Sequence, residues 1–289
     1  MTSGQVDVRK IETAPGFVFD ASVGGTPDKP LVLMLHGFGV SRHFWSRQVE
    51  ALAGAGYFAV APNQRGYSPG ARPDPKDLDA YRIERLVADA LDIAAAVGHG
   101  DKRFPLVGHD WGGSLSWIVA ARHPERLRSL TMLSRPHPAS FLRALAMPDG
   151  EQKRRSGHHT AFLEPDAVPK LLANDCEWLR SRHLKQGMPK EATDRHLSVL
   201  GNEPALEAAL AWYRSSGPRQ TLGPVSVPTL FLWGDADDTV GRVAAEGTGE
   251  FITAPYRFEV LPGVGHYAAD QVPDRVNELL LEHLARHPT

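Results

Sequence analysis

The sequence has almost no cysteine, since Cys176 is the only one among 289 residues. A single cysteine excludes an intramolecular disulfide, which favours a reducing compartment. No histidine stands close to Cys176 in sequence to activate its thiol. We therefore interpret Cys176 as a small buried side chain and not as a nucleophile.

Long apolar runs are absent as well. No stretch approaches the roughly 18 apolar residues that a membrane-spanning helix requires. Residues 1–10 are polar and contain no apolar segment of the kind that directs secretion. Together with the scarcity of cysteine, these absences predict a cytoplasmic protein without a membrane partner.

A surplus of one charge sign is also missing, because 32 Lys and Arg residues face 34 Asp and Glu residues. No basic stripe could follow a phosphate backbone, and the short basic run at 153–155 is typical of a solvated surface. We therefore expect no nucleic-acid partner. The chain instead has an ordinary globular balance, with 42% hydrophobic and 23% charged residues. It is long enough to bury a core without a disulfide or a metal.

Apolar patterning predicts strands and helices that alternate along the chain. Two antiparallel strands surround the turn at 14–16, and buried strands are expected at 31–35, 57–61, 104–107, 127–133, 229–233 and 257–261. Helical spacing occurs at 44–55, 81–97, 113–122, 243–251 and 273–284. This order predicts an α/β protein with a mostly parallel sheet and helices on both faces.

The alternation is interrupted between residues 136 and 218, where helical segments occur without a clear strand. Because the alternation resumes afterwards, we predict one core domain built from residues 1–135 and 219–289. Residues 136–218 are then an inserted helical cap. Such an insertion usually lies over the carboxyl ends of the strands, where open α/β sheets bind ligands.

The segment from Gly108 to Gly113 has the layout of a nucleophile elbow, which is glycine, any residue, nucleophile, any residue, glycine. It follows a predicted strand and opens a helix. The turn is so tight that Gly108 and Gly112 must be small, and it would hold Asp110 above the sheet near the first amides of the helix. A helix N-cap is the plainer interpretation of an aspartate here. The flanking glycines favour the nucleophile.

A nucleophile of this kind needs an acid, a base and an oxyanion hole. The acid is expected in the segment 233–238, after a strand, and the base is His266, in a glycine-rich loop after the next strand. For the oxyanion we predict the backbone N–H groups of Trp111 and Phe38, the latter in the loop that ends the strand at 31–35.

An aspartate nucleophile selects the chemistry. A serine that attacks an sp³ carbon would leave an ether, which water does not readily cleave. A carboxylate leaves an ester, whose carbonyl can be attacked by water with His266 as general base. Asp110 therefore predicts an epoxide or an alkyl halide as substrate, and disfavours ordinary carboxylic esters.

Over nearly its whole length the chain resembles the α/β-hydrolase superfamily, and within it the branch of epoxide hydrolases and dehalogenases, most of all the bacterial epoxide hydrolases. The motifs that carry this resemblance lie at 36–38, 63–68, 108–113, 234–237 and 265–266. The resemblance implies that the acid is Asp237, the last residue of a G-x-x-D pattern, with Asp235 and Asp238 as weaker alternatives.

The resemblance also implies two proton donors in the cap, usually tyrosines. One is Tyr213, in the segment 211–214, and the position of the other, seven residues before Pro165, is occupied by His158 with His159 beside it. Epoxide opening develops an alkoxide, which needs such a donor. A His–Tyr pair is known in one subgroup of epoxide hydrolases, whereas haloacetate dehalogenases also place a histidine here.

Dehalogenation by the same ester route is the alternative function. Haloacid dehalogenases carry arginines one and four residues after the nucleophile, and this chain has Trp111 and Ser114 there. In haloalkane dehalogenases the indole after the nucleophile binds halide, which Trp111 could do. A ligand-binding protein on an inactive scaffold is disfavoured, since nucleophile, acid and base are all present.

Two positions depart from the branch. Gly39 replaces a usual proline, which is expected to loosen the loop that carries Phe38, and Asn63 replaces a common aspartate.

We therefore predict hydrolysis of a small apolar epoxide to a vicinal diol, without metal or organic cofactor, and leave the oligomeric state open, with a homodimer as a candidate. The side chains expected to bind substrate are Phe38, Trp111, His159, Phe162 and Trp212.

Overall fold

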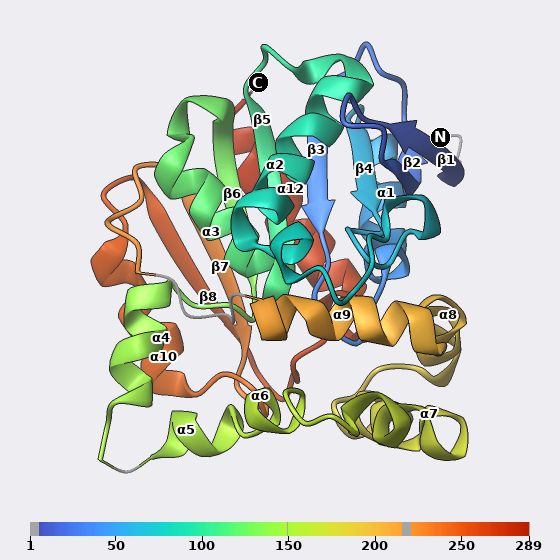
Figure 1. The fold of residues 1–289 in the computed structure, drawn as a ribbon. Coiled ribbons are helices and arrows are strands. Elements are labelled where there is room, and N and C mark those ends of the chain that lie inside the picture. The colour runs from blue at the N-terminus through green and yellow to red at the C-terminus, as the bar shows by residue number, and fades with distance from the viewer. Residues whose placement is uncertain (1–5, 149, 216–220, 289) are drawn as a thin grey trace.

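The computed structural model describes residues 6–148, 150–215 and 221–288, and an eight-stranded sheet forms its centre (Figure 1). The strand order is β1-β2-β4-β3-β5-β6-β7-β8. Strands β1 (Val6–Glu12) and β2 (Val18–Gly24) form an antiparallel hairpin at one edge, and β2 is also antiparallel to β4 (Phe58–Pro62).

The other neighbouring pairs are parallel. These strands are β3 (Leu31–Leu35), β5 (Phe104–His109), β6 (Leu127–Leu133), β7 (Thr229–Gly234) and β8 (Tyr256–Leu261). Every residue of β3, β4, β5 and β7 is buried. Burial on both faces explains why these strands are continuous apolar runs without alternation.

Helices cover both faces of the sheet. Alternate side chains of β3 enter two different hydrophobic clusters, with Leu33 in one and Met34 in the other. The first cluster contains side chains of α2 (Ile83–Ala94) and α3 (Asp110–Arg122), and the second those of α1 (Ser46–Gly54) and α12 (Pro273–Arg286). The predicted α/β class, with a mostly parallel sheet between layers of helices, is confirmed.

Some boundaries differ from the prediction because short turns extend the helices. The expected helix at 44–55 is a 3₁₀ turn, Arg42–Trp45, followed by α1, and the one at 243–251 is α10 (Arg242–Glu246) followed by a 3₁₀ turn, Gly247–Phe251. The helix expected from residue 113 begins at Asp110, where glycines had obscured its start. A short α11 (Ala268–Gln271) precedes α12.

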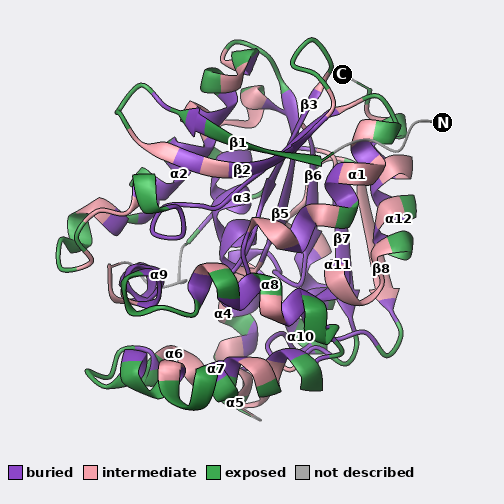
Figure 2. Cartoon of the chain, turned by 90° about the vertical axis from the view of Figure 1, so that its right-hand side faces the viewer, coloured by how far each residue is buried: buried purple, intermediate pink, exposed green. Residues whose placement is uncertain are grey.

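Six helices and no strand occupy the described residues between β6 and β7. They are α4 (Pro138–Leu145), α5 (Glu151–Arg155), α6 (His158–Ala161), α7 (Ala167–Lys185), α8 (Lys190–Leu200) and α9 (Glu203–Ser215). In Figure 1 they lie across the ends toward which the strand arrows point, and in Figure 2 their outer surfaces are largely exposed. The boundary expected at 218–219 lies outside the described residues, so the division into core and cap stays a prediction.

Helix α7 is interrupted near its middle. The backbone leaves helical geometry at Ala173, and Asn174, Asp175 and Cys176 have φ values of 51°, 58° and 61°. Three successive non-glycine residues in the left-handed region are strained. Helix α7 is thus two helical pieces joined by a strained turn. Cys176 is buried, as expected.

Among the described residues, none of the helices has the length and apolar character needed to cross a bilayer.

Candidate active site

The turn between β5 and α3 holds Asp110 in a strained conformation, with a φ of 48°. Only glycine fits beside it. A Cβ atom on Gly108 would lie 2.4 Å from the Ser116 hydroxyl, and one on Gly112 would lie 2.2 Å from the Leu35 carbonyl oxygen. A side chain on Gly37 would come within 2.4 Å of the Asp110 Cβ. The glycines therefore let the end of β3 approach the turn closely.

The two carboxylate oxygens of Asp110 face different groups. Oδ1 accepts a hydrogen bond of 2.9 Å from the backbone N–H of Phe38, and Oδ2 lies 3.7 Å from Nε2 of His266. Burial alone would raise the pKa of Asp110, but the adjacent His266 holds it well below its usual value. Asp110 is therefore ionised at neutral pH, as a nucleophile must be.

His266 is oriented by a buried carboxylate. Its Nδ1 lies 3.0 Å from Oδ2 and 3.1 Å from Oδ1 of Asp237. Asp237 also accepts the backbone N–H groups of Thr239 and Val240, at 2.7 and 3.1 Å. Burial opposes the charge on His266, but Asp237 and then Asp110 raise its pKa to about 9. The ring that faces Asp110 is thus cationic at neutral pH while both carboxylates are charged.

The weaker acid candidates make other contacts. Asp235 accepts the backbone N–H of Gly263 at 2.7 Å, and Asp238 pairs with Arg182 at 2.8 Å. Of the three aspartates, Asp237 is the one in contact with His266.

A small cavity of about 20 Å³ lies between Asp110 and the inserted helices. It is lined by Phe38, Asp110, His158, Phe162, Trp178, Arg182, Tyr213, Thr239 and His266. This volume has room for about one water molecule. Residues from the nucleophile turn, the loop after β3 and the helices α6, α7 and α9 therefore meet at one point.

Tyr213 and His158 both border this cavity. The ring of Tyr213 lies edge-on to Phe38 and Trp111, at centroid distances of 5.5 and 5.1 Å. Burial and then the charge of Asp110 raise the pKa of Tyr213 well above its usual value, so it keeps its proton. Burial and then the charge of Arg182 lower the pKa of His158 to about 4, so its imidazole is neutral at pH 7.

Three side chains expected to bind substrate do not line the cavity. The ring of His159 packs on Tyr213 at 5.6 Å, and the Trp111 indole is buried behind Tyr213. Trp212 lies farther back, against Trp111, and donates its indole N–H to the Arg65 carbonyl at 3.1 Å. Neighbours on a helix point about 100° apart, so Tyr213 and Trp212 cannot both face the cavity.

The looser loop expected at Gly39 stays a prediction, but the backbone conformation of this residue excludes proline. This glycine has a φ of 81°, in a region that the proline ring cannot adopt. The loop therefore follows a different path from one built around proline. Phe38 nevertheless lies within hydrogen-bonding distance of Asp110, as described above.

The polar contacts that hold the loops of Asp237 and His266 were not predicted from the sequence. Gln186, after α7, accepts the His266 backbone N–H at 2.9 Å, and Arg155 of α5 donates to the Asp237 carbonyl. Arg182 donates to Asp238 and to the Thr239 hydroxyl, at 2.8 and 2.6 Å. None of these residues stands at a fixed spacing from a motif, so no local signal could have found them.

Within the described ranges, no group of three or more His, Cys, Asp or Glu side chains is arranged to hold a metal ion.

Comparison with known proteins identifies the fold family of this chain. Residues 30–272 match a family model described as alpha/beta hydrolase fold. The chain is 30% identical to AB hydrolase superfamily protein YfhM of Bacillus subtilis, over 93% of this chain and 95% of that protein. It is 28% identical to epoxide hydrolase A of Mycobacterium tuberculosis, over 90% of this chain and 92% of that one.

A solved structure has the same fold. The crystal structure of epoxide hydrolase A from Mycobacterium thermoresistibile superposes with a TM-score of 0.81 at 26% identity, covering 97% of this chain and 98% of that one.

Proposed function

Since the chain belongs to the alpha/beta hydrolase fold family, we propose that it hydrolyses an epoxide to a vicinal diol through an ester on Asp110. The observation that carries the proposal is that the Asp110 carboxylate lies between a backbone N–H donor, from Phe38, and the imidazole of His266. Oδ1 of Asp110 is held by the Phe38 N–H, while Oδ2 is directed at His266, and Tyr213 borders the same cavity. Relatives named as epoxide hydrolases support the choice of substrate.

In the first step Oδ2 of Asp110 attacks an epoxide carbon and the carbon–oxygen bond of the ring breaks. Tyr213, with His158 nearby, transfers a proton to the oxygen that is released. The product of this step is a hydroxyalkyl ester and a tyrosinate. Because the ester has no charge on Asp110, a major cause of the raised His266 pKa disappears, so the ring releases its proton to solvent and becomes a base. It regains a proton from solvent when the Asp110 carboxylate is restored at the end of the cycle.

In the second step His266 takes a proton from water, and the hydroxide attacks the carbonyl carbon of the ester. The oxyanion forms on Oδ1, next to the N–H of Phe38 and the predicted N–H of Trp111. Collapse breaks the bond between that carbon and Oδ2, and His266 protonates the departing diol oxygen. The remaining water proton returns to Tyr213. Asp237 keeps His266 oriented throughout.

Tyr213 favours an epoxide over a halide, because a halide ion needs no proton when it leaves whereas an alkoxide does. Dehalogenation by the same route remains the second candidate.

The test is intact-protein mass spectrometry of His266→Gln after incubation with a panel of epoxides and alkyl halides. Without the base, the Asp110 ester should accumulate, and an adduct with the full mass of an epoxide should map to the Asp110 peptide. The Asp110→Ala variant is the control and should give no adduct. Adducts from halides alone, each lacking the halogen, would replace the proposal with dehalogenation.

A further inference from the structure

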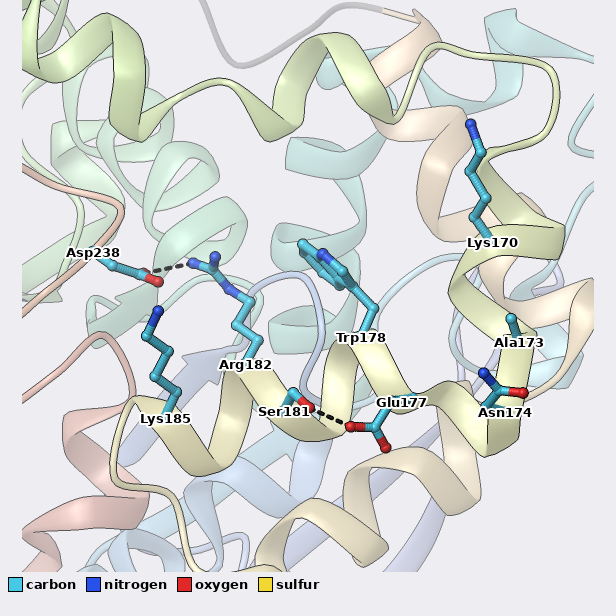
Figure 3. A pocket seen from close by; sticks show the side chains of 9 residues that line it. All are labelled: Lys170, Ala173, Asn174, Glu177, Trp178, Ser181, Arg182, Lys185 and Asp238. Atoms are coloured by element: carbon cyan, nitrogen blue, oxygen red, sulfur yellow. Dashed lines mark hydrogen bonds and ion pairs between the residues drawn. The ribbon is translucent and has the colours of Figure 1, made fainter.

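Trp178, on the second piece of α7, borders three spaces in the described part of the chain. One is the catalytic cavity of about 20 Å³. The second, which we call the apolar pocket, has about 350 Å³ and lies between α6 and the first piece of α7. The third, the outer pocket, has about 550 Å³ and is drawn in Figure 3.

The apolar pocket shares part of its lining with the catalytic cavity. Ala161, Phe162, Ala167 and Leu171 provide most of its apolar lining. Three of its lining side chains, His158, Phe162 and Trp178, also line the catalytic cavity. The two spaces are therefore adjacent and share these three side chains, which we call the partition.

The outer pocket has a different chemistry. Figure 3 shows Arg182 paired with Asp238, and Lys185 on the same side of the pocket. The Ser181 hydroxyl donates a hydrogen bond to Glu177. A hydrocarbon group gains little by burial among charged side chains, whereas it is stabilised in the apolar pocket. Of the two neighbouring spaces, the apolar pocket is therefore the one suited to an alkyl or aryl group.

The catalytic cavity is too small for a substrate in the conformation described. A space for about one water cannot hold an epoxide with its substituent. Within the partition, Phe162 is 3% exposed, whereas Trp178 is 42% exposed and follows the strained turn at 174–176. Strained backbone of this kind is typical of segments that change conformation in function. His158, the third member, is half-buried, so Trp178 is the most exposed member of the partition and has the most room to move.

We propose that the apolar pocket receives the hydrocarbon substituent of the epoxide, and that Trp178 determines which substituents reach it. This inference rests on the proposed epoxide hydrolysis. It defines the substrate class as epoxides in which one ring carbon, the one not held at Asp110, carries an apolar chain or ring. Displacement of the Trp178 indole joins the two spaces, so that the reacting carbon lies at Asp110 while the substituent lies between α6 and α7.

The test compares terminal epoxides with ethyl, butyl and octyl substituents, using kcat/KM for diol formation. Ala161 is exposed and lines the apolar pocket, so Ala161→Trp fills that pocket without overpacking a core. We expect it to lower the octyl-to-ethyl ratio of kcat/KM about tenfold or more, since each methylene in a hydrophobic pocket contributes to discrimination. Trp178→Ala should raise the same ratio.

The matched control is Leu163→Trp, which adds an indole to an exposed neighbour that lines none of the three spaces, and it should leave the ratio unchanged. Circular dichroism and thermal unfolding show whether each variant folds. A ratio that stays constant in Ala161→Trp and Trp178→Ala, with diol still formed, would overturn this inference alone. A ratio that responds only to Lys185→Trp would assign the substituent to the outer pocket. If wild-type protein converts no epoxide, the proposed function fails and this inference fails with it.

Discussion

At the scale of single residues, the proposed mechanism makes the distinction between epoxide and halide depend on the hydroxyl group of Tyr213. The ring of Tyr213 packs against Phe38 and Trp111, and its raised pKa keeps the hydroxyl protonated. We expect this hydroxyl to protonate the developing alkoxide. Tyr213→Phe keeps this ring packing and removes only the acid. We expect kcat for diol formation to fall by about 10²–10⁴-fold, the usual contribution of general acid catalysis.

Steady-state assays of diol formation check this prediction. Tyr256→Phe is the control, because that tyrosine lies on the edge strand β8 and its buried hydroxyl has no hydrogen-bond partner among the described residues. It should retain wild-type kcat. An unchanged kcat in Tyr213→Phe would transfer the donor role to His158.

His266 makes stability depend on pH. Its pKa is raised from the usual 6.5 to about 9 in the folded protein by the charges of Asp237 and Asp110. A group whose pKa is raised by folding stabilises the folded state fully below its unfolded pKa, and this contribution is lost as the pH rises through the folded pKa. The difference in unfolding free energy between wild type and His266→Gln should therefore shrink between pH 6.5 and 9.

Urea unfolding of both proteins at several pH values across this range measures that difference. A difference that grows with pH would show that His266 is neutral in the folded protein.

At the scale of elements, the nucleophile turn is set by how closely β3 approaches α3. Gly112→Ala would place a Cβ 2.2 Å from the Leu35 carbonyl oxygen, so strand and helix must separate. We expect a loss of about 1–3 kcal/mol in unfolding free energy from overpacking, together with loss of activity as Asp110 shifts from the Phe38 N–H.

Gly54→Ala is the matched control for this substitution. Gly54 ends α1, and an added Cβ would meet no atom within 4 Å. Alanine there should leave activity unchanged and raise the unfolding free energy by up to about 1 kcal/mol, because alanine favours helix. Equal stability of Gly112→Ala and wild type would show that the turn can relax.

Helices α5 and α7 make hydrogen bonds to the loops of the site as well as covering it. Arg155, Arg182 and Gln186 bond to the loops that carry Asp237 and His266. The inserted helices, of which α7 borders the cavity, therefore also contact the loops of Asp237 and His266, the proposed acid and base. A change in α7 that admits a larger substrate can alter the orientation of His266 as well.

At the scale of the whole molecule, each face of the sheet packs into its own hydrophobic cluster. The inserted helices α4 to α9 lie across the carboxyl ends of the strands (Figure 1). The left-handed turn in α7 was not predicted, because Asn174, Asp175 and Cys176 include no glycine, although asparagine and aspartate tolerate this conformation better than most residues. The cavity likewise combines side chains from segments more than 200 residues apart, such as Phe38 and His266.

The sequence by itself determined the α/β class, the parallel sheet and the turn that presents Asp110, because hydrophobic period and glycine spacing are local properties. It also singled out Asp110, His266 and Tyr213, which the structure brings to one cavity, although their catalytic roles stay predictions. Trp178 and Trp212 were both candidates for the pocket from the sequence, and only the tertiary structure decided that Trp212 packs away from the cavity while Trp178, together with Arg182, lines it. The reason is physical: the direction of a side chain on a packed helix depends on which face its neighbours cover, and no spacing within the sequence records those neighbours.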